Sequence, residues 1–300
     1  MELKLDETRP FNLDHTLSCG QVFRWEKIDR WWEGVVEGNV IRITQERDRL
    51  LFRTNHSAED CAEFLKNYLR LDDDLPMILS SIDKDSWVNS AIQKFHGLRL
   101  IRQNPWECLI SYICATNTNI PAIKNRILEL SKRFGDEVTF EDKVFYTFPE
   151  PQELAEADLD ELKSCGLGYR AKYVLKTAKK IKASPDLLKA FKSLEYEELR
   201  KGLLSLAGVG PKVADCITLF AFDKLEAFPI DVWVRRVMYQ RYLKKEIPQY
   251  PKTGRAKPLT GSEYDELRSF AWRYFGKYAG YAQQYLFYHI RIEESRRMSG

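Results

Sequence analysis

Two patterns of hydrophobic positions divide the chain. Up to about residue 75, short runs rich in aromatic and β-branched residues alternate with polar turn signals such as Asp29-Arg30 and Gly38-Asn39. This texture is typical of an antiparallel meander. A segment with helical spacing follows, and Ser57 is its candidate N-cap. The four runs that we expect to be strands are FRWEKID, RWWEGVVEG, NVIRITQ and RLLFRT.

From about Asp85 onward, apolar residues recur at three- and four-residue spacing, which predicts helices. The class is therefore α+β: a small N-terminal antiparallel β-sheet domain with a flanking helix over residues 1–84, then a mostly helical body over 85–300. Pro251, Gly254, Pro258 and Gly261 crowd one polar stretch, which predicts a surface loop before a late helix. The clearest helical segments are DSWVNSAIQKF, PWECLISYICATN, IPAIKNRILELSKRFG, YRAKYVLKTAKKIKA and SEYDELRSFAWRYFG.

Composition narrows the class of protein. The 300 residues are 44% hydrophobic, enough to bury a core, and the formal net charge is only +3, so nucleic-acid binding would need a local basic patch. Six scattered cysteines without a C-x-x-C pair and only four histidines lack the spacing of a metal site. The start of the chain is too polar for a signal peptide, and no apolar run approaches a membrane span. We expect a cytoplasmic protein with no membrane partner.

The sharpest local pattern is EELRKGLLSLAGVGPKVADCITLFAF. Two helices with buried stripes flank a turn that contains Gly208 and Gly210, which predicts a helix-hairpin-helix at about 196–222. Pro211 suits the first turn of the second helix. The free N–H groups at that helix start form an anion site, for which a nucleic-acid phosphate is the natural occupant. An ordinary helical hairpin with a glycine turn is the alternative.

Lys212 stands in the first turn of the second helix, where the helix dipole disfavours a cation. A sequence selected only for stability would have Asp or Glu there. An amine nucleophile and a phosphate-binding lysine both fit this position.

Asp231 follows Pro229 at the start of another amphipathic helix, where Asp is favoured as an N-cap. One helix and a short loop separate it from Lys212, so the chain can return to the mouth of the hairpin. An amine beside a carboxylate suits attack on a sugar C1′, because the anion stabilises the developing oxocarbenium ion. Such an attack forms a Schiff base and opens the way to β-elimination.

These residues resemble the helix-hairpin-helix, Gly/Pro-rich, Asp superfamily of DNA glycosylases. More specifically, the chain looks like a member of the eukaryotic-type 8-oxoguanine DNA glycosylase family, whose members also carry abasic-site lyase activity. The resemblance covers nearly the whole chain in the same order. It rests on CGQVFRWE, RQNPWECLISYICATNTNI, GLGYRAKY, LAGVGPKVADC, FPIDV and YAGYAQQYLF.

The resemblance implies that Lys212 is the nucleophile and Asp231 the catalytic carboxylate. It also implies a base pocket for 8-oxoguanine. Gly20 would place its carbonyl against N7–H of the oxidised base. Guanine would be disfavoured there, because its N7 is an acceptor and would face the carbonyl oxygen, another acceptor. Cys216 and Phe287 would sandwich the flipped base, and Gln283 would bind its Watson–Crick edge. Without the resemblance, Cys216 and Phe287 fit ordinary core positions.

The remaining implied contacts are to DNA. A first group of residues would fill the gap that base flipping leaves, and a second group would hold phosphate through backbone N–H groups. Trp233 would lie near the DNA backbone. We expect no cofactor and no catalytic metal, although the hairpin could hold a structural monovalent cation. The partner would be duplex DNA containing 8-oxoguanine, bound by a monomer. The first group is Asn117, Tyr169 and Arg170, and the second is Gly208, Gly210 and Val213.

The chain departs from the animal pattern at two positions. Ala122 stands where animal members have an arginine that helps to read the cytosine opposite the lesion, so we expect looser discrimination of the opposite base. Trp233 replaces a histidine near the DNA backbone. The long basic tail of nuclear relatives is missing after RRMSG, which favours a bacterial or archaeal origin and association with the nucleoid.

Two other functions compete. A monofunctional alkylated-base glycosylase would keep the aspartate but would need no lysine, so Lys212 argues against it. A non-catalytic helix-hairpin-helix DNA-binding protein would be weakened by a carboxylate such as Asp231 beside its phosphate-binding surface, because like charges repel. An iron–sulfur glycosylase is disfavoured because the four-cysteine C-terminal cluster is absent from the sequence.

Overall fold

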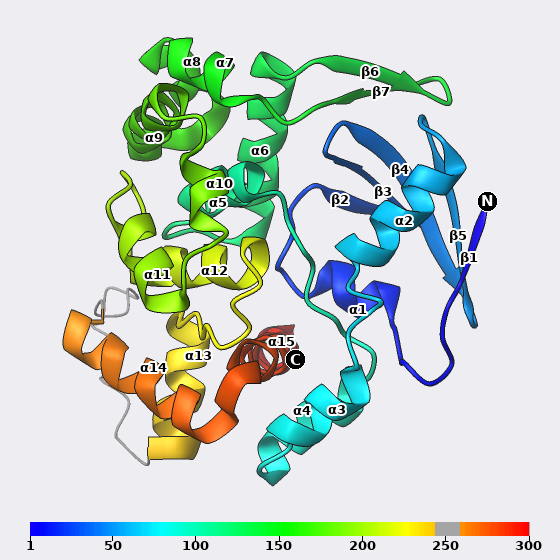
Figure 1. Cartoon of the computed structure of the whole chain (residues 1–300), viewed down its shortest axis with the longest axis vertical. Helices are drawn as coiled ribbons and strands as arrows, with labels where there is room; N and C mark the ends of the chain where they lie inside the picture. The colour runs from blue at the N-terminus through cyan, green and yellow to red at the C-terminus, as the bar shows by residue number, and fades with distance from the viewer. Residues whose placement is uncertain (244–258, 300) are drawn as a thin grey trace.

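The computed structural model of the chain describes residues 1–243 and 259–299. They form an antiparallel sheet beside a larger, mostly helical body (Figure 1). The α+β class predicted from the sequence is confirmed. Of the predicted surface loop, Pro251, Gly254 and Pro258 lie outside the described residues, and Gly261 is the first residue of a helix.

The sheet has five antiparallel strands in the order β1-β5-β4-β3-β2. Its central strands join through two-residue turns, such as Asp29-Arg30 between Ile28 and Trp31. Asp29 has φ 54°, a left-handed conformation that Asp tolerates better than most residues. The strands are β1 (Glu2–Lys4), β2 (Trp25–Ile28), β3 (Trp31–Val36), β4 (Asn39–Glu46) and β5 (Arg49–Thr54). The four predicted runs are therefore strands. β1 forms one edge of the sheet, and no periodic pattern in the sequence predicts it.

One face of the sheet packs on α1 (Leu13–Ser18) and α2 (Ala58–Tyr68). The Ser57 side chain accepts a hydrogen bond from Asp60 N–H and caps α2, as its sequence predicts. The helices and strands bury a hydrophobic core of their own, separate from that of the body. That core includes Leu17, Trp25, Trp32, Ile41, Ile43, Leu50, Phe52, Leu65 and Tyr68.

The apolar faces of α3 (Leu75–Ile82) and α4 (Ser86–Lys94) join the hydrophobic core of the helical body. The division of domains at residue 84 stays a prediction. The long C-terminal helix α15 (Ala279–Ser299) packs against α3, α4 and α13 (Val232–Val237). The other helices are α5 (Pro105–Cys114), α6 (Ile120–Phe134), α7 (Pro151–Glu156), α8 (Leu159–Leu162), α9 (Ala171–Ala183), α10 (Leu187–Phe191), α11 (Tyr196–Leu204), α12 (Pro211–Ala221) and α14 (Gly261–Phe275).

A hairpin of β6 (Glu137–Phe140) and β7 (Lys143–Tyr146) extends from the body toward the sheet (Figure 1). Glu141 at its tip pairs with Arg42 and, at 3.1 Å, with Arg53 of the sheet. Sequence patterns did not reveal this hairpin, because its strands are short and only partly buried.

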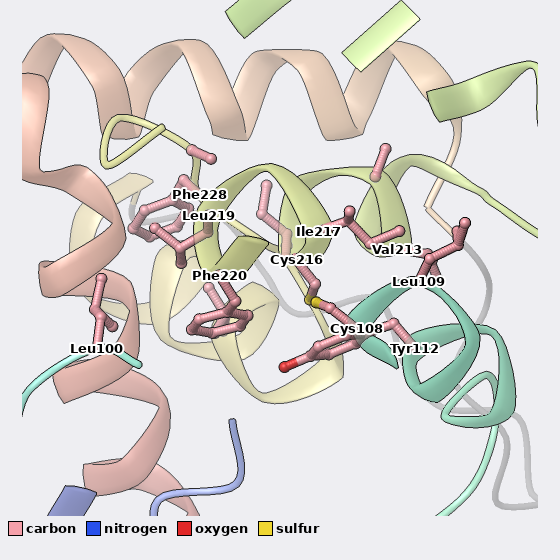
Figure 2. Close-up of a cluster of buried hydrophobic side chains, with 14 of the residues drawn as sticks. Leu100, Cys108, Leu109, Tyr112, Val213, Cys216, Ile217, Leu219, Phe220 and Phe228 are labelled. Atoms are coloured by element: carbon pink, nitrogen blue, oxygen red, sulfur yellow. The ribbon is translucent and has the colours of Figure 1, made fainter. Parts of the chain in front are cut away.

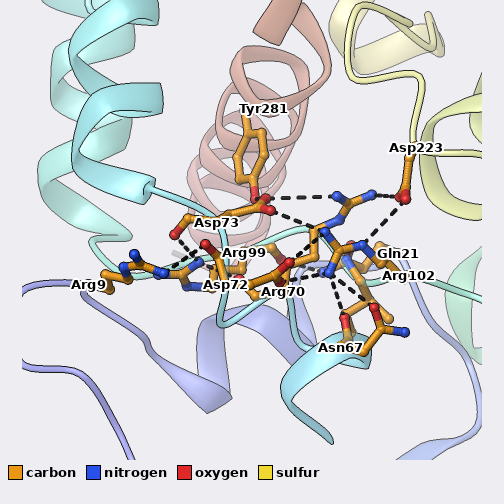
Figure 3. Close-up of polar contacts among 11 residues, drawn as sticks. Arg9, Gln21, Asn67, Arg70, Asp72, Asp73, Arg99, Arg102, Asp223 and Tyr281 are labelled. Atoms are coloured by element: carbon orange, nitrogen blue, oxygen red, sulfur yellow. Dashed lines mark hydrogen bonds and ion pairs between the residues drawn. The ribbon is translucent and has the colours of Figure 1, made fainter. Parts of the chain in front are cut away.

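A buried polar junction joins the sheet domain to the body (Figure 3). Arg99 is fully buried, and its guanidinium donates to the carbonyl oxygens of Pro10 at 3.2 Å and Asp73 at 3.0 Å. The Asp73 carboxylate accepts a hydrogen bond of 2.6 Å from the Tyr281 hydroxyl on α15. Because buried charges need such partners, the junction permits one relative placement of the two parts.

Gln21 links this junction to the neighbouring Gly20. Its amide nitrogen donates to the carbonyl oxygens of Thr16 at 2.9 Å and Arg99 at 2.8 Å. Its amide oxygen accepts the Ile101 N–H at 2.9 Å. The side chain is fully buried, so these bonds fix the backbone that follows α1.

Replacing Gln21 with Leu should lower the free energy of unfolding by at least about 2 kcal/mol, because it leaves buried backbone groups without partners. The comparison is Gln152→Leu on α7, where the side chain is exposed and the expected change is below about 0.5 kcal/mol. Chemical denaturation measures both. Equal stability of the two variants would show that the bonds of Gln21 are not needed.

Candidate active site

The predicted helix-hairpin-helix is formed by α11 and α12. Gly208 in its turn has φ +82°, and a Cβ there would lie 2.7 Å from Cβ of Tyr173, so only glycine fits. Gly210 is the N-cap of α12, with no side chain capping the helix and open space beside its α-carbon. The start of α12 can therefore receive an anion. As expected, the stripes Leu199, Leu203, Leu206 and Val213, Ile217, Phe220 are buried.

Lys212 lies in the first turn of α12 and is half-buried. Its Nζ stands 5.2 Å from the centroid of the Tyr112 ring on α5, within the range of a cation–π contact. The Tyr112 hydroxyl donates to the carbonyl oxygen of Gln21 at 3.1 Å, so the ring against Lys212 is itself anchored. The lysine is held at the mouth of the hairpin rather than extended into solvent.

Cys216 lies one turn after Lys212 on α12. Burial raises the pKa of its thiol to about 12, although the neighbouring Lys212 charge and a hydrogen bond from that lysine lower it. Figure 2 shows its sulfur beside Tyr112 and Cys108. Cys216 is therefore a neutral thiol at physiological pH.

Asp231 is the N-cap of α13, as predicted, and its Oδ1 accepts the N–H groups of Trp233 at 3.0 Å and Val234 at 2.8 Å. Burial raises the pKa of this carboxyl, and the charge of Lys212 is the largest influence that lowers it. Within residues 1–243 and 259–299, Asp231 and Lys212 are electrostatic neighbours without an ion pair between them. The capping role and a chemical role are thus compatible.

A buried carboxylate on α12 supports this arrangement. Asp215 is fully buried on α12 and accepts hydrogen bonds from Arg200 at 2.9 Å and from the Tyr264 hydroxyl at 2.7 Å. The same hydroxyl accepts the N–H of Ile230, the residue before Asp231, at 3.2 Å. The network ties the segment that carries Asp231 to the helix that carries Lys212. Sequence reasoning missed it, although an Asp within the apolar stretch VADCITLF was a visible signal.

The predicted pocket residues Gly20 and Phe287 meet across the domains. Gly20 has φ +95°, and a Cβ there would lie 3.4 Å from the Phe287 ring and 3.0 Å from Ile120. It would also collide with the guanidinium of Arg291. Sequence reasoning did not identify Ile120 or Arg291, because nothing local connects them to a residue so far away in the chain.

Gln283 lies one turn before Phe287 on α15 and is 5% exposed. Its side-chain oxygen is buried and has no hydrogen-bond partner in the described part of the chain. A buried acceptor without a partner is costly, so this amide suits the binding of a polar ligand.

Asn117, Tyr169 and Arg170 come together at the ends of α5 and α9. The Asn117 amide contacts the Tyr169 hydroxyl at 3.4 Å, and the Arg170 guanidinium lies 4.5 Å from the Tyr169 ring centroid. Arg170 is buried and donates to the carbonyl oxygen of Thr116 at 2.9 Å, whereas Tyr169 is 52% exposed. Arg170 thus braces this loop, and Asn117, with φ 51°, and Tyr169 form its surface.

Two further residues singled out by the sequence lie at helix starts. Ala122 is half-buried in the first turn of α6, where its N–H donates to the Asn119 side chain at 3.0 Å. Trp233 is half-buried in the first turn of α13, and the Arg236 guanidinium lies 5.2 Å from its ring.

Among residues 1–243 and 259–299, no group of three or more His, Cys, Asp or Glu side chains could hold a metal ion. No helix there is long and apolar enough to cross a membrane.

Comparisons with known proteins divide the chain into two adjoining matches. Residues 2–109 match the N-terminal domain of 8-oxoguanine DNA glycosylase. Residues 110–257 match the HhH-GPD superfamily of base excision DNA repair proteins.

Relatives match over most of the chain. The N-glycosylase/DNA lyase of Saccharomyces cerevisiae is 33% identical over 92% of this chain and 82% of its own. A probable N-glycosylase/DNA lyase of Methanothermobacter thermautotrophicus is 34% identical over 69% and 68%. The Clostridium acetobutylicum 8-oxoguanine glycosylase/lyase, solved with double-stranded DNA containing cytosine opposite 8-oxoguanine, is 31% identical over 95% and 93%, with a TM-score of 0.85.

The resemblance read from the sequence is confirmed by these matches, which run through both parts of the fold. A full-length relationship above 30% identity, together with the architecture, shows that the chain belongs to the 8-oxoguanine DNA glycosylase family of the HhH-GPD superfamily.

Proposed function

We propose that this protein is a bifunctional DNA glycosylase that excises 8-oxoguanine from duplex DNA and then cleaves the strand at the abasic site. The observation that carries the proposal is the placement of the Lys212 amine and the Asp231 carboxylate beside the start of α12. The relatives named N-glycosylase/DNA lyase, and the clostridial enzyme with 8-oxoguanine in its DNA, support the same activity.

In the proposed mechanism, the Lys212 amine attacks C1′ of the damaged nucleotide. The N9–C1′ bond breaks and its electron pair leaves with the base, while the Nζ–C1′ bond forms and the nitrogen loses a proton that can pass to the base. The Asp231 carboxylate stabilises the oxocarbenium-like transition state. Opening of the sugar ring then gives a Schiff base, from which β-elimination cleaves the strand.

The DNA backbone would be held by the N–H groups of Gly208, Gly210 and Val213, with Trp233 nearby. Phosphate contacts of this kind fix position without reading sequence. Gly208 and Gly210 support this role, because their missing side chains leave the hairpin backbone approachable. A structural monovalent cation at the hairpin carbonyls would belong to the same contact, and no other cofactor is part of the proposal.

The flipped base would lie between Cys216 and Phe287. A neutral thiol and an aromatic ring suit its two faces, and the buried acceptor of Gln283 suits the donors on its Watson–Crick edge. The Gly20 carbonyl would accept N7–H, which 8-oxoguanine has and guanine lacks. The fixed backbone beside Gln21 supports this discrimination, since a mobile carbonyl could turn away from guanine N7.

Asn117 and Tyr169 would enter the gap in the duplex, with Arg170 holding their loop in place. The remaining parts of the proposal are that the protein acts as a monomer and works in the cytoplasm, at the nucleoid of a prokaryote. A DNA substrate is compatible with the proposed location, and the proposed site residues all come from one chain, which is compatible with a monomer.

Replacing Lys212 with Gln should leave binding of lesion DNA intact but slow base excision by roughly a thousandfold or more, because the nucleophile is lost. Borohydride should no longer trap a covalent enzyme–DNA adduct. The matched control is Lys201→Gln on α11, an exposed lysine of the same hairpin. Full excision by the Lys212 variant without an adduct would instead indicate a monofunctional enzyme.

The raised pKa of Asp231 predicts the pH dependence of excision. Catalysis needs the ionised carboxylate, so the rate should be full above that pKa and fall as the pH drops through it. Because burial raises the pKa, the fall should occur at a higher pH than the usual value of about 4. Single-turnover rates between pH 4 and 8, with folding followed by circular dichroism, measure it.

The matched variant is Asp231→Asn, which keeps a good N-cap and should cost at most about 1 kcal/mol of stability. It should excise 8-oxoguanine roughly a hundredfold more slowly, and its excision rate should no longer fall as the pH is lowered. An unchanged rate in this variant would reduce Asp231 to a capping residue.

Ala122 predicts loose discrimination of the opposite base, because its side chain offers no donor to cytosine. Excision opposite each of the four bases should differ less in the wild type than in Ala122→Arg, which should favour cytosine by a further factor of about 10. Single-turnover assays on four duplexes test this. A strong cytosine preference in the wild type would contradict it.

A further inference from the structure

Arg291 is a charged group in the candidate base pocket that the family resemblance does not assign. It lies one turn after Phe287 on α15, and its guanidinium is 5.5 Å from the Phe287 ring centroid. Its Nη2 donates to the carbonyl oxygen of Ser18 at 2.6 Å. Its Nη1 contacts the α-carbon side of Gly20, where an added Cβ would collide with it. The guanidinium therefore lies directly beside the Gly20 peptide.

The same guanidinium lies within electrostatic reach of the Asp231 carboxylate. Burial lowers the pKa of Arg291, and the Asp231 charge raises it. The Arg291 charge in turn lowers the pKa of Cys19, which burial raises to about 11. A guanidinium stays charged and carries five N–H donors, so its place beside Gly20 suggests a functional reason.

The chemistry of the base supplies one. 8-Oxoguanine differs from guanine at two adjacent atoms: N7 carries a hydrogen, and C8 carries an oxygen that accepts hydrogen bonds. A carbonyl acceptor next to a guanidinium donor is complementary to this pair. Gly20 offers the acceptor, and Arg291 offers the donor beside it.

We propose that Arg291 donates a hydrogen bond to O8 of the flipped 8-oxoguanine and stabilises the negative charge that the base gains on leaving. This inference rests on the proposed function. When the N9–C1′ bond breaks, its electron pair enters the base and spreads in part onto O8, while Lys212 forms the Nζ–C1′ bond and releases the balancing proton. A fixed cation at O8 interacts more strongly with the leaving base than with the bound substrate.

The first test compares two reactions of one variant. Arg291→Met should slow single-turnover excision of 8-oxoguanine by about 10- to 100-fold, the loss expected for one charge-assisted hydrogen bond. Borohydride trapping at a preformed abasic site should fall by a much smaller factor, because no base occupies the pocket. Arg291→Lys, which keeps the charge and a donor, should recover part of the excision rate. The control is Arg273→Met, an exposed arginine on α14, which should match the wild type.

The second test isolates the contact with O8. Replacing this oxygen by sulfur, a weaker acceptor, should slow the wild type more than it slows Arg291→Met, because the variant has no contact to lose. Far-UV circular dichroism and thermal unfolding verify that each variant is folded.

Each other outcome overturns the inference. Equal losses of excision and trapping would make Arg291 a support for the Ser18 loop alone. An unchanged excision rate in Arg291→Met, or equal slowing of both enzymes by sulfur, would exclude the contact with O8. A wild type that neither excises 8-oxoguanine nor forms an adduct would contradict the proposed function itself, which separates that failure from a failure at Arg291.

Discussion

The guanidinium of Arg99 lies fully buried between the sheet and the helical body, where it donates to carbonyl oxygens of Pro10 and Asp73 (Figure 3). The candidate pocket depends on this junction, because Gly20 comes from the sheet side and Phe287 from α15. Gln21 continues the junction to Gly20 through three buried hydrogen bonds. A pocket that reads one hydrogen on a purine tolerates little displacement, and the buried hydrogen bonds of this junction resist displacement.

Two carboxylates near α12 differ in what surrounds them. Asp215 is enclosed by Arg200 and two tyrosine hydroxyls, so its hydrogen-bonding capacity is used within the fold. Asp231 accepts two backbone N–H groups, and the charge of Lys212 lowers its pKa. The first carboxylate holds the framework, and the second remains available to stabilise a cation between the two groups.

Several functional positions also satisfy ordinary structural preferences. Asp231 caps a helix, Cys216 fills an apolar face, and Arg170 braces a loop. A local pattern therefore could not separate the two roles, and the resemblance over the whole chain was needed to favour the chemical one. The converse holds for Arg291 and Ile120. No local sequence pattern identifies them, and only their proximity to Gly20 places them in the pocket.

Much was determined by the sequence itself, because short-range physics decides it. Residues a few positions apart determine the alternation of strand segments with turns, the cap at Ser57, the glycine turn before Pro211 and the N-cap at Asp231. Tertiary structure alone decided which residues meet over long separations, such as Gly20 with Arg291 and Asp73 with Tyr281. Those meetings depend on how two hydrophobic cores pack and on which buried polar groups find partners. Neither is encoded in the spacing of neighbouring residues.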